Sequence, residues 1–394
     1  MITRFRVQNY KALRDVTLDL TPIHVLIGPN DTGKTSILEA VAALCRSVDH
    51  ELGQAFTGRW QGCELVWESS PELPISLHVG LNYDGRDLAY TLICQFTRTG
   101  RLAKIVTEST SIAGETVRMD SQQWPESRVF HTAVLAEQTP ENMRKPALLV
   151  YEALRGVHYY RWNPRLLSLP VAPDSRRRFR MEQSGFGLAL CLDDILGYDR
   201  GRFIDLERQF CDIFGQIRSV KLVSEMAYRS PVDDAQQIPM LQQAEGKGIY
   251  FQFKGNEALI PASQVSDGIL LVLAYLTILH LPQPPRVILV EEPENGIHPR
   301  RLRDVLGILK DLVKKQSHTQ VILTTHSPYV VDMFDAGEVS ICTKNEDGSV
   351  SVHRLSDSKT VREQLDVFTL GEIWTAEGDE ALVKSTRIGE GAGQ

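Results

Sequence analysis

One stretch near the start of the chain limits the possible folds more than any other. A buried-strand run at Ile23–Ile27 leads into a glycine-rich segment, and helix-forming residues follow at Ile37–Val41. Glycines let backbone N–H groups curl around an anion, and the next helix turns its positive end toward that anion. The spacing G-x-x-x-x-G-K-T from Gly28 to Thr35 therefore predicts a phosphate-binding loop between a buried strand and a helix.

The predicted loop offers the groups that a nucleoside triphosphate needs. Lys34 adds a full positive charge for the outer phosphates, and Thr35 offers a hydroxyl group to Mg²⁺. We therefore expect a nucleoside triphosphate and Mg²⁺ as ligands. The residues expected to contact the nucleotide in this loop are Gly28, Pro29, Asn30, Asp31, Thr32, Gly33, Lys34, Thr35 and Ser36.

Composition places the chain among ordinary globular proteins. Its 394 residues are 42% hydrophobic and 24% charged, with a net charge of −7 that leaves room for a local basic patch. The apolar run Gly268–Leu281 is far shorter than the roughly 20 residues that cross a bilayer. Six scattered cysteines form no C-x-x-C pair, and the N-terminus lacks the layout of a secretion signal. We expect a cytoplasmic protein with reduced thiols and no membrane contact.

Sequence periodicity divides the chain into three segments. The first contains the phosphate loop and a β meander, the second is irregular and rich in proline breaks, and the third alternates strands with helices. Such alternation indicates a parallel sheet flanked by helices, so the predicted class is α/β. The segments are residues 1–119, an inserted and mostly helical subdomain at 120–249, and residues 250–394. In the third segment we expect helices at Ser266–Leu281 and Pro299–Lys315.

The meander is predicted from strict alternation of apolar and polar residues. This alternation runs from Leu73 to Val117, and it is broken by turn signals at Asp84–Gly85 and Thr99–Gly100. The pattern is typical of antiparallel strands that are buried on one face only.

A second motif places two carboxylates at the end of an apolar strand. The strand Val287–Val290 runs into Glu291 and Glu292. In parallel sheets, phosphate ligands lie at the carboxyl ends of the strands, so two acids there can serve a metal ion and an attacking water. Alone, these acids would fit a solvated strand end. The phosphate loop upstream favours the functional interpretation.

Four motifs together resemble those of ABC-type ATPase heads. In chain order they correspond to the Walker A, signature, Walker B and switch-histidine motifs, at Gly28–Thr35, Val265–Gly268, Val287–Glu292 and Thr324–Pro328. NYKALRDVTLDL, VSDG, EEPENGIHP and TTHSP are similar to the RecF/SMC/OLD branch, and YYRWNP and SGFGLALCLDDIL to its stand-alone ATPases. The resemblance covers nearly the whole chain and implies an ABC-type head with an inserted helical subdomain and a parallel P-loop core sheet.

The resemblance implies ATP as the nucleotide and a role for each matching residue. Lys34 and the loop backbone would hold the β- and γ-phosphates, while Thr35 and Glu291 would hold Mg²⁺. Glu292 would act on the attacking water, and His326 would contact the γ-phosphate. The catalytic residues would thus be Lys34, Glu292 and His326.

The resemblance also implies a homodimer that sandwiches two ATP molecules. Ser266 and Gly268 would contact the nucleotide bound to the other copy. Both stand at the start of an apolar helix, where free N–H groups can receive an anion. A serine at this position is also an ordinary helix cap, and that alternative stays open.

Two departures from the family pattern affect these expectations, and one family feature has only a candidate residue. Glu291 stands where most such heads have aspartate, and its longer side chain can slow turnover because Mg²⁺ is strict about its octahedral geometry. The signature is Val-Ser-Asp-Gly, not Leu-Ser-Gly-Gly-Gln. Gln61 is the best candidate for the family's glutamine loop, although a surface turn explains it equally well.

Two arginine clusters are candidates for contact with nucleic acid. One surrounds Phe179, and the other begins a helix after Pro299. Solvated surface arginines are the simpler interpretation of both. The arginines are Arg176, Arg177, Arg178 and Arg180 in the first cluster, and Arg300, Arg301 and Arg303 in the second.

These observations favour an ATP-hydrolysing switch of a DNA-repair or phage-defence system. OLD-type nucleases carry a nuclease domain after the ATPase, but only 68 residues follow His326, so we expect a separate effector such as a nuclease. One alternative is the ATPase subunit of a membrane transporter, which the long insertion and the incomplete signature disfavour. A nucleotide sensor with little turnover is another alternative.

Overall fold

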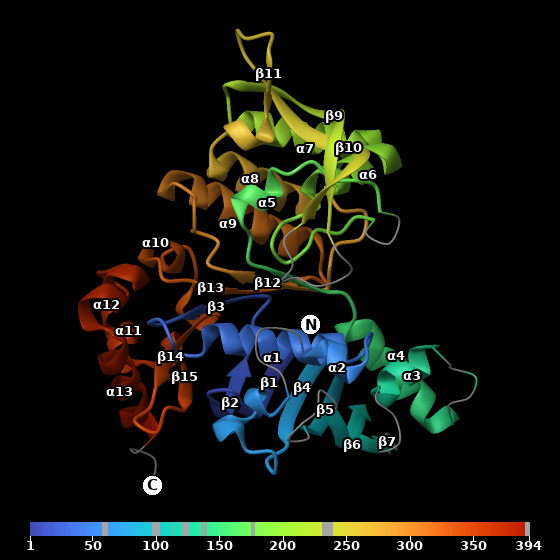
Figure 1. The fold of residues 1–394 in the computed structure, drawn as a ribbon. Helices are drawn as coiled ribbons and strands as arrows, with labels where there is room; N and C mark the ends of the chain where they lie inside the picture. Colours follow the sequence, from blue (N-terminus) through green and yellow to red (C-terminus); the bar gives the residue numbers. More distant parts are fainter. Residues whose placement is uncertain are drawn as a thin grey trace. The chain divides into compact units, whose positions relative to one another are not determined.

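The chain folds into two compact units, each built from separate segments (Figure 1). A computed structural model describes residues 1–56, 62–96, 103–112, 114–119, 126–134, 137, 140–174, 178–230 and 239–390. Gln61, Thr99–Gly100, Arg176 and Arg177 lie outside these residues. The first unit comprises residues 1–158, 285–291 and 318–394, and the second comprises residues 159–284 and 292–317.

The first unit contains an antiparallel sheet of six strands in the order β2-β1-β4-β5-β6-β7. Its strands are β1 (Ile2–Tyr10), β2 (Leu13–Asp19), β4 (Ile75–Tyr83), β5 (Arg86–Phe96), β6 (Ala103–Ile112) and β7 (Glu115–Met119). In β1, Phe5 and Val7 are buried while Arg4 and Arg6 are exposed, so one face of the sheet covers a core. The predicted meander is confirmed, and the first two strands extend it.

A second sheet of six strands, in the order β15-β14-β3-β13-β12-β8, forms the core of the phosphate-loop fold. Its strands are β3 (Ile23–Ile27), β8 (Val157–Tyr160), β12 (Val287–Glu291), β13 (Gln320–Thr324), β14 (Val339–Lys344) and β15 (Val350–Arg354). Strands β12, β13, β3 and β14 run parallel, and β15 is an antiparallel edge strand. Every residue of β3 and β13 is buried, as is typical of parallel strands. The predicted parallel sheet is confirmed, with β14 and β15 as additions.

The helices of the first unit lie at its phosphate loop, its meander and its C-terminal end. They are α1 (Lys34–Arg46), α2 (Leu52–Ala55), α3 (Arg128–Val134), α4 (Glu141–Leu154), α10 (Pro328–Val331), α11 (Lys359–Gln364), α12 (Leu370–Glu377) and α13 (Asp379–Glu390). Helix α1 starts directly after the loop, as predicted, whereas α10 to α13 were not predicted. Among the described residues, no helix is both long enough and apolar enough to span a bilayer.

A single buried amide joins the two sheets of the first unit. Gln320, at the start of β13, is 1% exposed. Its Oε1 accepts a hydrogen bond from the N–H of Ile2 at 2.9 Å, and its Nε2 donates to the carbonyls of Ile2 and Thr21 at 2.8 and 2.9 Å. One side chain of the second sheet therefore satisfies two backbone groups of β1 in the first sheet and one carbonyl in the connection between β2 and β3.

The second unit combines five helices with a three-stranded antiparallel sheet in the order β11-β10-β9. The elements are α5 (Pro164–Leu167), α6 (Leu188–Tyr198), α7 (Arg200–Ile213), β9 (Ile217–Arg229), β10 (Met240–Phe253), β11 (Leu259–Pro261), α8 (Asp267–Leu279) and α9 (Pro299–Lys315). All residues of α8 from Ile269 to Leu279 are buried, and α9 has the predicted bounds.

The prediction of a mostly helical segment over residues 120–249 is wrong for its last third. Strand β9 and the first part of β10 form a long hairpin there. Polar residues such as Lys221, Ser224 and Glu225 fill β9, so the apolar alternation that signals a strand is weak. In addition, α3 and α4 belong to the first unit, so the units divide the chain at different places from the predicted segments.

Candidate nucleotide-binding site

The phosphate loop requires glycine at two positions. Gly28 and Gly33 have φ angles of 132° and 81°. A Cβ atom would lie 2.3 Å from the carbonyl oxygen of Cys342 at the first position and 2.6 Å from a methyl group of Val350 at the second. Because Gly33 is also the N-cap of α1, no capping side chain competes for the first N–H groups of the helix. These groups can bind an anion.

Lys34 lies inside the loop and not on the surface. Lys34 is only 6% exposed. Its Nζ donates hydrogen bonds to the carbonyls of Gly28 at 2.8 Å and Pro29 at 2.6 Å. Burial raises the pKa of the nearby Cys342 thiol to about 12, although Lys34 acts in the opposite direction. At neutral pH no thiolate at Cys342 cancels the positive charge of Lys34.

The register of the core sheet brings Glu291 and His326 to the edge where the loop begins. Glu291 pairs with Thr324 on β13, and Thr324 pairs with Leu26 on β3, two residues before Gly28. The N–H of Ser327 donates to Oγ1 of Thr325 at 3.0 Å, which fixes the turn that carries half-buried His326. This edge contains the carboxyl ends of three parallel strands, where phosphate ligands bind in such sheets.

Glu292 follows Glu291 in the sequence but belongs to the second unit. Its φ angle of 46° lies in the left-handed region, which costs a residue other than glycine about 1–3 kcal/mol and is concentrated at functional sites. The Nδ2 of Asn295 donates to Oε2 of Glu292 at 2.5 Å. The boundary between the two units therefore falls between the two predicted site carboxylates.

Ser266 and Gly268 lie at the N-terminus of α8, in the second unit. Ser266 is the N-cap, yet its side chain makes no capping hydrogen bond, so the ordinary capping role is absent in this structure. A Cβ atom at Gly268 would come no closer than 3.8 Å to the carbonyl oxygen of Gly296. Contact between these residues and a second copy of the chain stays a prediction.

The residues of the first unit fit a nucleotide with its Mg²⁺ ion. Thr35 is exposed in the first turn of α1, and Glu291 is half-buried at the end of β12. Hydroxyl and carboxylate oxygens are the hard ligands that Mg²⁺ prefers, and the phosphates and water supply the remaining ligands. At Gly28 and Gly33 a Cβ atom would clash with the backbone of Cys342 and the side chain of Val350, so only glycine lets the loop backbone take this shape.

Two contacts at the site could not be read from the sequence. Lys344, at the end of β14, donates to the carboxylate of Asp31 inside the loop. Asp31 has a φ angle of 65°, and Lys344 follows it by 313 residues. The second contact is between Asn295 and Glu292. The fold alone brings Asp31 and Lys344 together. The turn after β12 brings Glu292 and Asn295 together, and no sequence motif signals this contact.

The predicted basic clusters are partly neutralised by their own neighbours. Arg178 lies 3.9 Å from Asp194, and Arg301 lies 3.1 Å from Asp304. The remaining described arginines of the two clusters, Arg180, Arg300 and Arg303, are exposed. Both clusters belong to the second unit.

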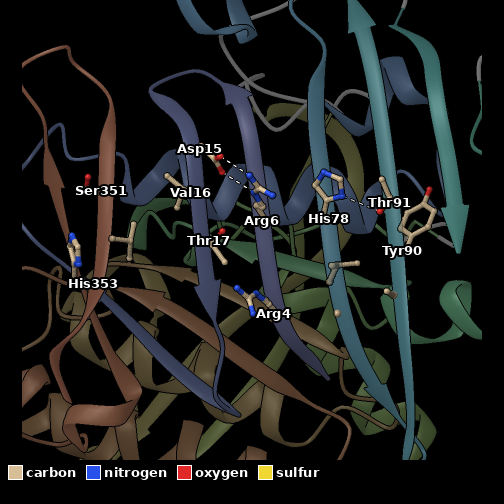
Figure 2. Close-up of a pocket in the computed structure, with 14 residues that line it drawn as sticks. Arg4, Arg6, Asp15, Val16, Thr17, His78, Tyr90, Thr91, Ser351 and His353 are labelled. Atoms are coloured by element: carbon tan, nitrogen blue, oxygen red, sulfur yellow. Dashed lines mark hydrogen bonds and ion pairs between the residues drawn. The ribbon is translucent and has the colours of Figure 1, made fainter. Parts of the chain in front are cut away.

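A large groove of about 890 Å³ lies away from the phosphate loop, on the solvent face of the antiparallel sheet (Figure 2). Two arginines line it, but Arg6 pairs with Asp15 at 2.7 Å and Arg4 lies 3.7 Å from Asp19. Figure 2 shows Arg6 and Asp15 facing each other across two neighbouring strands. No residue of the phosphate loop lines this groove, so it is not the nucleotide site.

Two family models match separate parts of the chain, and one known protein is similar over its whole length. Residues 1–93 match the family described as "AAA ATPase domain", and residues 177–332 match the family described as "AAA domain, putative AbiEii toxin, Type IV TA system". Over its full length, the chain is 21% identical to an OLD nuclease of Thermus scotoductus and covers 72% of that protein.

A solved structure shows the same fold. It is the crystal structure of an SMC head bound to the C-terminal winged-helix domain of ScpA, with a TM-score of 0.52 and 15% sequence identity. The match covers 89% of this chain and 97% of that one. The chain therefore has the fold of an SMC-like ABC-type ATPase head and is a distant homologue of the OLD nuclease.

Proposed function

We propose that the protein binds ATP with Mg²⁺, hydrolyses it, and uses the cycle as a molecular switch. The observation that carries this proposal is the register of β12, β13 and β3, because it aligns Glu291 and the His326 turn with the start of the phosphate loop. The fold and the AAA family matches support the same assignment.

In this proposal each residue has a distinct task in phosphoryl transfer to water. Lys34 and the N–H groups of the loop hold the β- and γ-phosphates, and His326 contacts the γ-phosphate. Thr35 and Glu291 would hold Mg²⁺, which would supply positive charge against the phosphates. Glu292 accepts a proton from the attacking water while the water oxygen forms a bond to the γ-phosphorus. The bond between the γ-phosphorus and the oxygen that bridges it to the β-phosphate breaks, and its electrons leave with ADP.

We also propose that ATP joins two copies of the chain through Ser266 and Gly268. One observation supports this: the N-terminus of α8 has a serine whose side chain is not used as a cap. The N–H groups there can receive a phosphate of the partner copy. The fold of an SMC-like head supports the same arrangement.

The biological setting that best suits these features is a defence or repair system with a separate effector. Support comes from the similarity to an OLD nuclease and from the family description that names a type IV toxin–antitoxin system. We propose that the effector is a nuclease on another chain. Direct contact with nucleic acid would use the exposed arginines of the second unit.

Replacing Glu292 with glutamine tests the central proposal. The amide keeps the shape of the side chain and loses its basicity, so ATP affinity should stay within about threefold while turnover falls by about 10²–10⁴-fold. The variant should also accumulate as a dimer with ATP, measured by light scattering after size exclusion. Phosphate release and calorimetry with Mg²⁺ give turnover and affinity.

The matched control is Glu294→Gln, two residues further along the same turn. It should leave turnover near that of the wild type if the effect belongs to Glu292. Turnover in Glu292→Gln within a few-fold of the wild type would remove Glu292 from the assigned role. Absence of ATP binding by the folded wild-type protein would overturn the proposed function as a whole.

A further inference from the structure

The C-terminal part of the first unit exposes an unusual group of large apolar side chains. Tyr329 is 65% exposed, Leu365 42%, Val367 76% and Phe368 52%. We refer to these four residues as the C-terminal apolar surface. Apolar side chains clustered on a surface mark interaction sites more often than scattered ones do.

These side chains come from two segments that pack against each other. Helices α10 and α12 are in contact, and the N–H of Gly371 donates to Oδ1 of Asp332 at 2.6 Å. A Cβ atom at Gly371 would lie 2.5 Å from the carbonyl oxygen of Pro328, so the two backbones approach closely. Tyr329 directly follows Pro328, and Phe368 lies three residues before Gly371. Figure 1 shows α10, α11 and α12 grouped together.

The exposed segment has a fixed backbone. The N–H groups of Val367 and Phe368 both donate to the carbonyl of Gln364 at 3.0 Å, and the Gln364 side chain donates to Glu377 at 2.8 Å. Thr369 and Glu372 form a capping box at the start of α12. An ordered turn that presents apolar side chains to water loses little conformational entropy when it binds.

Acidic residues outnumber basic ones around this surface, and the bases Lys359 and Arg362 lie on α11, just before Leu365. Between residues 363 and 380 the sequence contains six acidic residues and no lysine or arginine, and between residues 326 and 343 it contains three acidic residues and neither base. Such a rim repels nucleic acid and also disfavours pairing with an identical surface on a second copy. It attracts a contact surface that carries positive charge.

We propose that the C-terminal apolar surface docks a different protein, whose contact surface is apolar at its centre and basic at its rim. Tyrosine and phenylalanine are suited to the centre of such a contact, with charges around it. The proposal deepens the proposed function, since it gives the expected effector a place to bind. Tyr329 lies three residues after His326, so the docked protein would contact the same segment that carries the predicted γ-phosphate contact.

The test uses two synthetic helical peptides, one of leucine and lysine and one of leucine and glutamate, as probes for the wild-type full-length chain. Fluorescence anisotropy at low salt should show saturable binding of the basic peptide and at least about tenfold weaker binding of the acidic one. The variant V367D/F368D, and separately Y329D, should weaken binding of the basic peptide about tenfold or more. Circular dichroism confirms that each variant is folded.

The matched control is M240D/L241D in the second unit. Met240 and Leu241 are 61% and 56% exposed, so their replacement measures general adhesion of peptides to exposed apolar residues. The control should bind the basic peptide within about twofold of the wild type. Equal losses in the control and in V367D/F368D would overturn the proposal, as would tight binding of the acidic peptide or undiminished binding by V367D/F368D and Y329D.

Two further measurements separate this proposal from its alternatives. If V367D/F368D converts a nucleotide-free dimer to a monomer, the occupant is a second copy and the proposal is wrong. The basic peptide should also bind K34A without ATP, and V367D/F368D should keep basal ATP turnover. Peptide binding without ATP turnover would overturn the proposed function alone, whereas turnover without peptide binding would overturn the docking surface alone.

Discussion

The two sheets of the first unit use polar residues in opposite ways. The antiparallel sheet spreads them over its solvent face, where Arg6 and Asp15 neutralise each other and line a large groove. The parallel sheet buries its strands and places polar groups at one edge, where Glu291 and the His326 turn meet the phosphate loop. The proposed nucleotide site therefore lies at the ends of parallel strands and not at this groove.

The largest effect that would test this contrast is the loss of Lys34. Lys34→Ala removes a buried ammonium whose charge-assisted hydrogen bonds to the outer phosphates would contribute about 1.5–3 kcal/mol each, so ATP affinity should fall about 100-fold or more. Calorimetry with Mg²⁺ measures the affinity. The matched control is Lys344→Ala, which removes the other lysine beside the loop and should change affinity only a few-fold. Unchanged affinity in folded Lys34→Ala would break the comparison.

The joint between the two sheets should be the next most sensitive point. Gln320→Leu keeps the volume of the side chain but leaves backbone groups of Ile2 and Thr21 unpaired. We expect the free energy of unfolding to fall by about 2–4 kcal/mol, measured in urea. The control Gln8→Leu removes an exposed amide bonded to Asp15 and should cost less than about 1 kcal/mol. Equal costs for both variants would refute a special role for Gln320.

A buried histidine gives the parallel sheet a pH dependence of its own. Burial lowers the pKa of His24 to about 3, with Arg354 acting in the same direction, and its ring is hydrogen-bonded to Thr21 and Ser340. Since the unfolded value is 6.5, the unfolded chain binds the extra proton between pH 6.5 and 3. Stability should therefore fall as pH decreases through this range, by up to about 1.4 kcal/mol per pH unit.

Urea unfolding at pH 7 and pH 5 measures this dependence. Between pH 7 and pH 5, the free energy of unfolding should fall by about 1–2 kcal/mol more in the wild type than in His24→Gln, because glutamine does not titrate. Other histidines stay the same in both proteins and cancel in the comparison. Identical differences for the two proteins would mean that His24 is not held neutral by the fold.

The smallest effect should come from the groove on the antiparallel sheet. Arg6→Ala removes an exposed ion pair, so the free energy of unfolding should change by about 0.2–1 kcal/mol, and ATP affinity should stay within about twofold. Thermal melting and calorimetry measure the two quantities. A large loss of ATP affinity would show that the groove is coupled to the nucleotide site and would remove the contrast between the sheets.

The sequence predicts elements well where local pattern and burial agree. Helix α9 was predicted with its bounds, because Pro299 starts it and its apolar positions face one side. The strands around the phosphate loop were predicted because continuous apolar runs end in motifs. Strand β9 was missed, since its polar side chains hide the alternation and its pairing with β10 decides its structure.

The site was predictable in composition and less so in geometry. Glu291 and His326 could be placed beside the loop, because strand ends in a parallel sheet share an edge. The left-handed backbone of Glu292 and the contact between Lys344 and Asp31 depend on tertiary structure, so no local sequence pattern predicts them. The C-terminal apolar surface also needed the fold, since only the packing of α10 on α12 relates Tyr329 to Phe368.

The order of strands in the core sheet has a consequence for synthesis on the ribosome. Strand β3 ends at Ile27, but its neighbours β13 and β14 begin only at Gln320 and Val339. The first neighbour is thus made 293 residues later (320 − 27), which takes about 15–60 s at about 5–20 residues per second. Throughout that interval the nascent chain carries a strand that is apolar except for His24 and whose native neighbours have not yet been made, so we expect it to need chaperones or temporary partners.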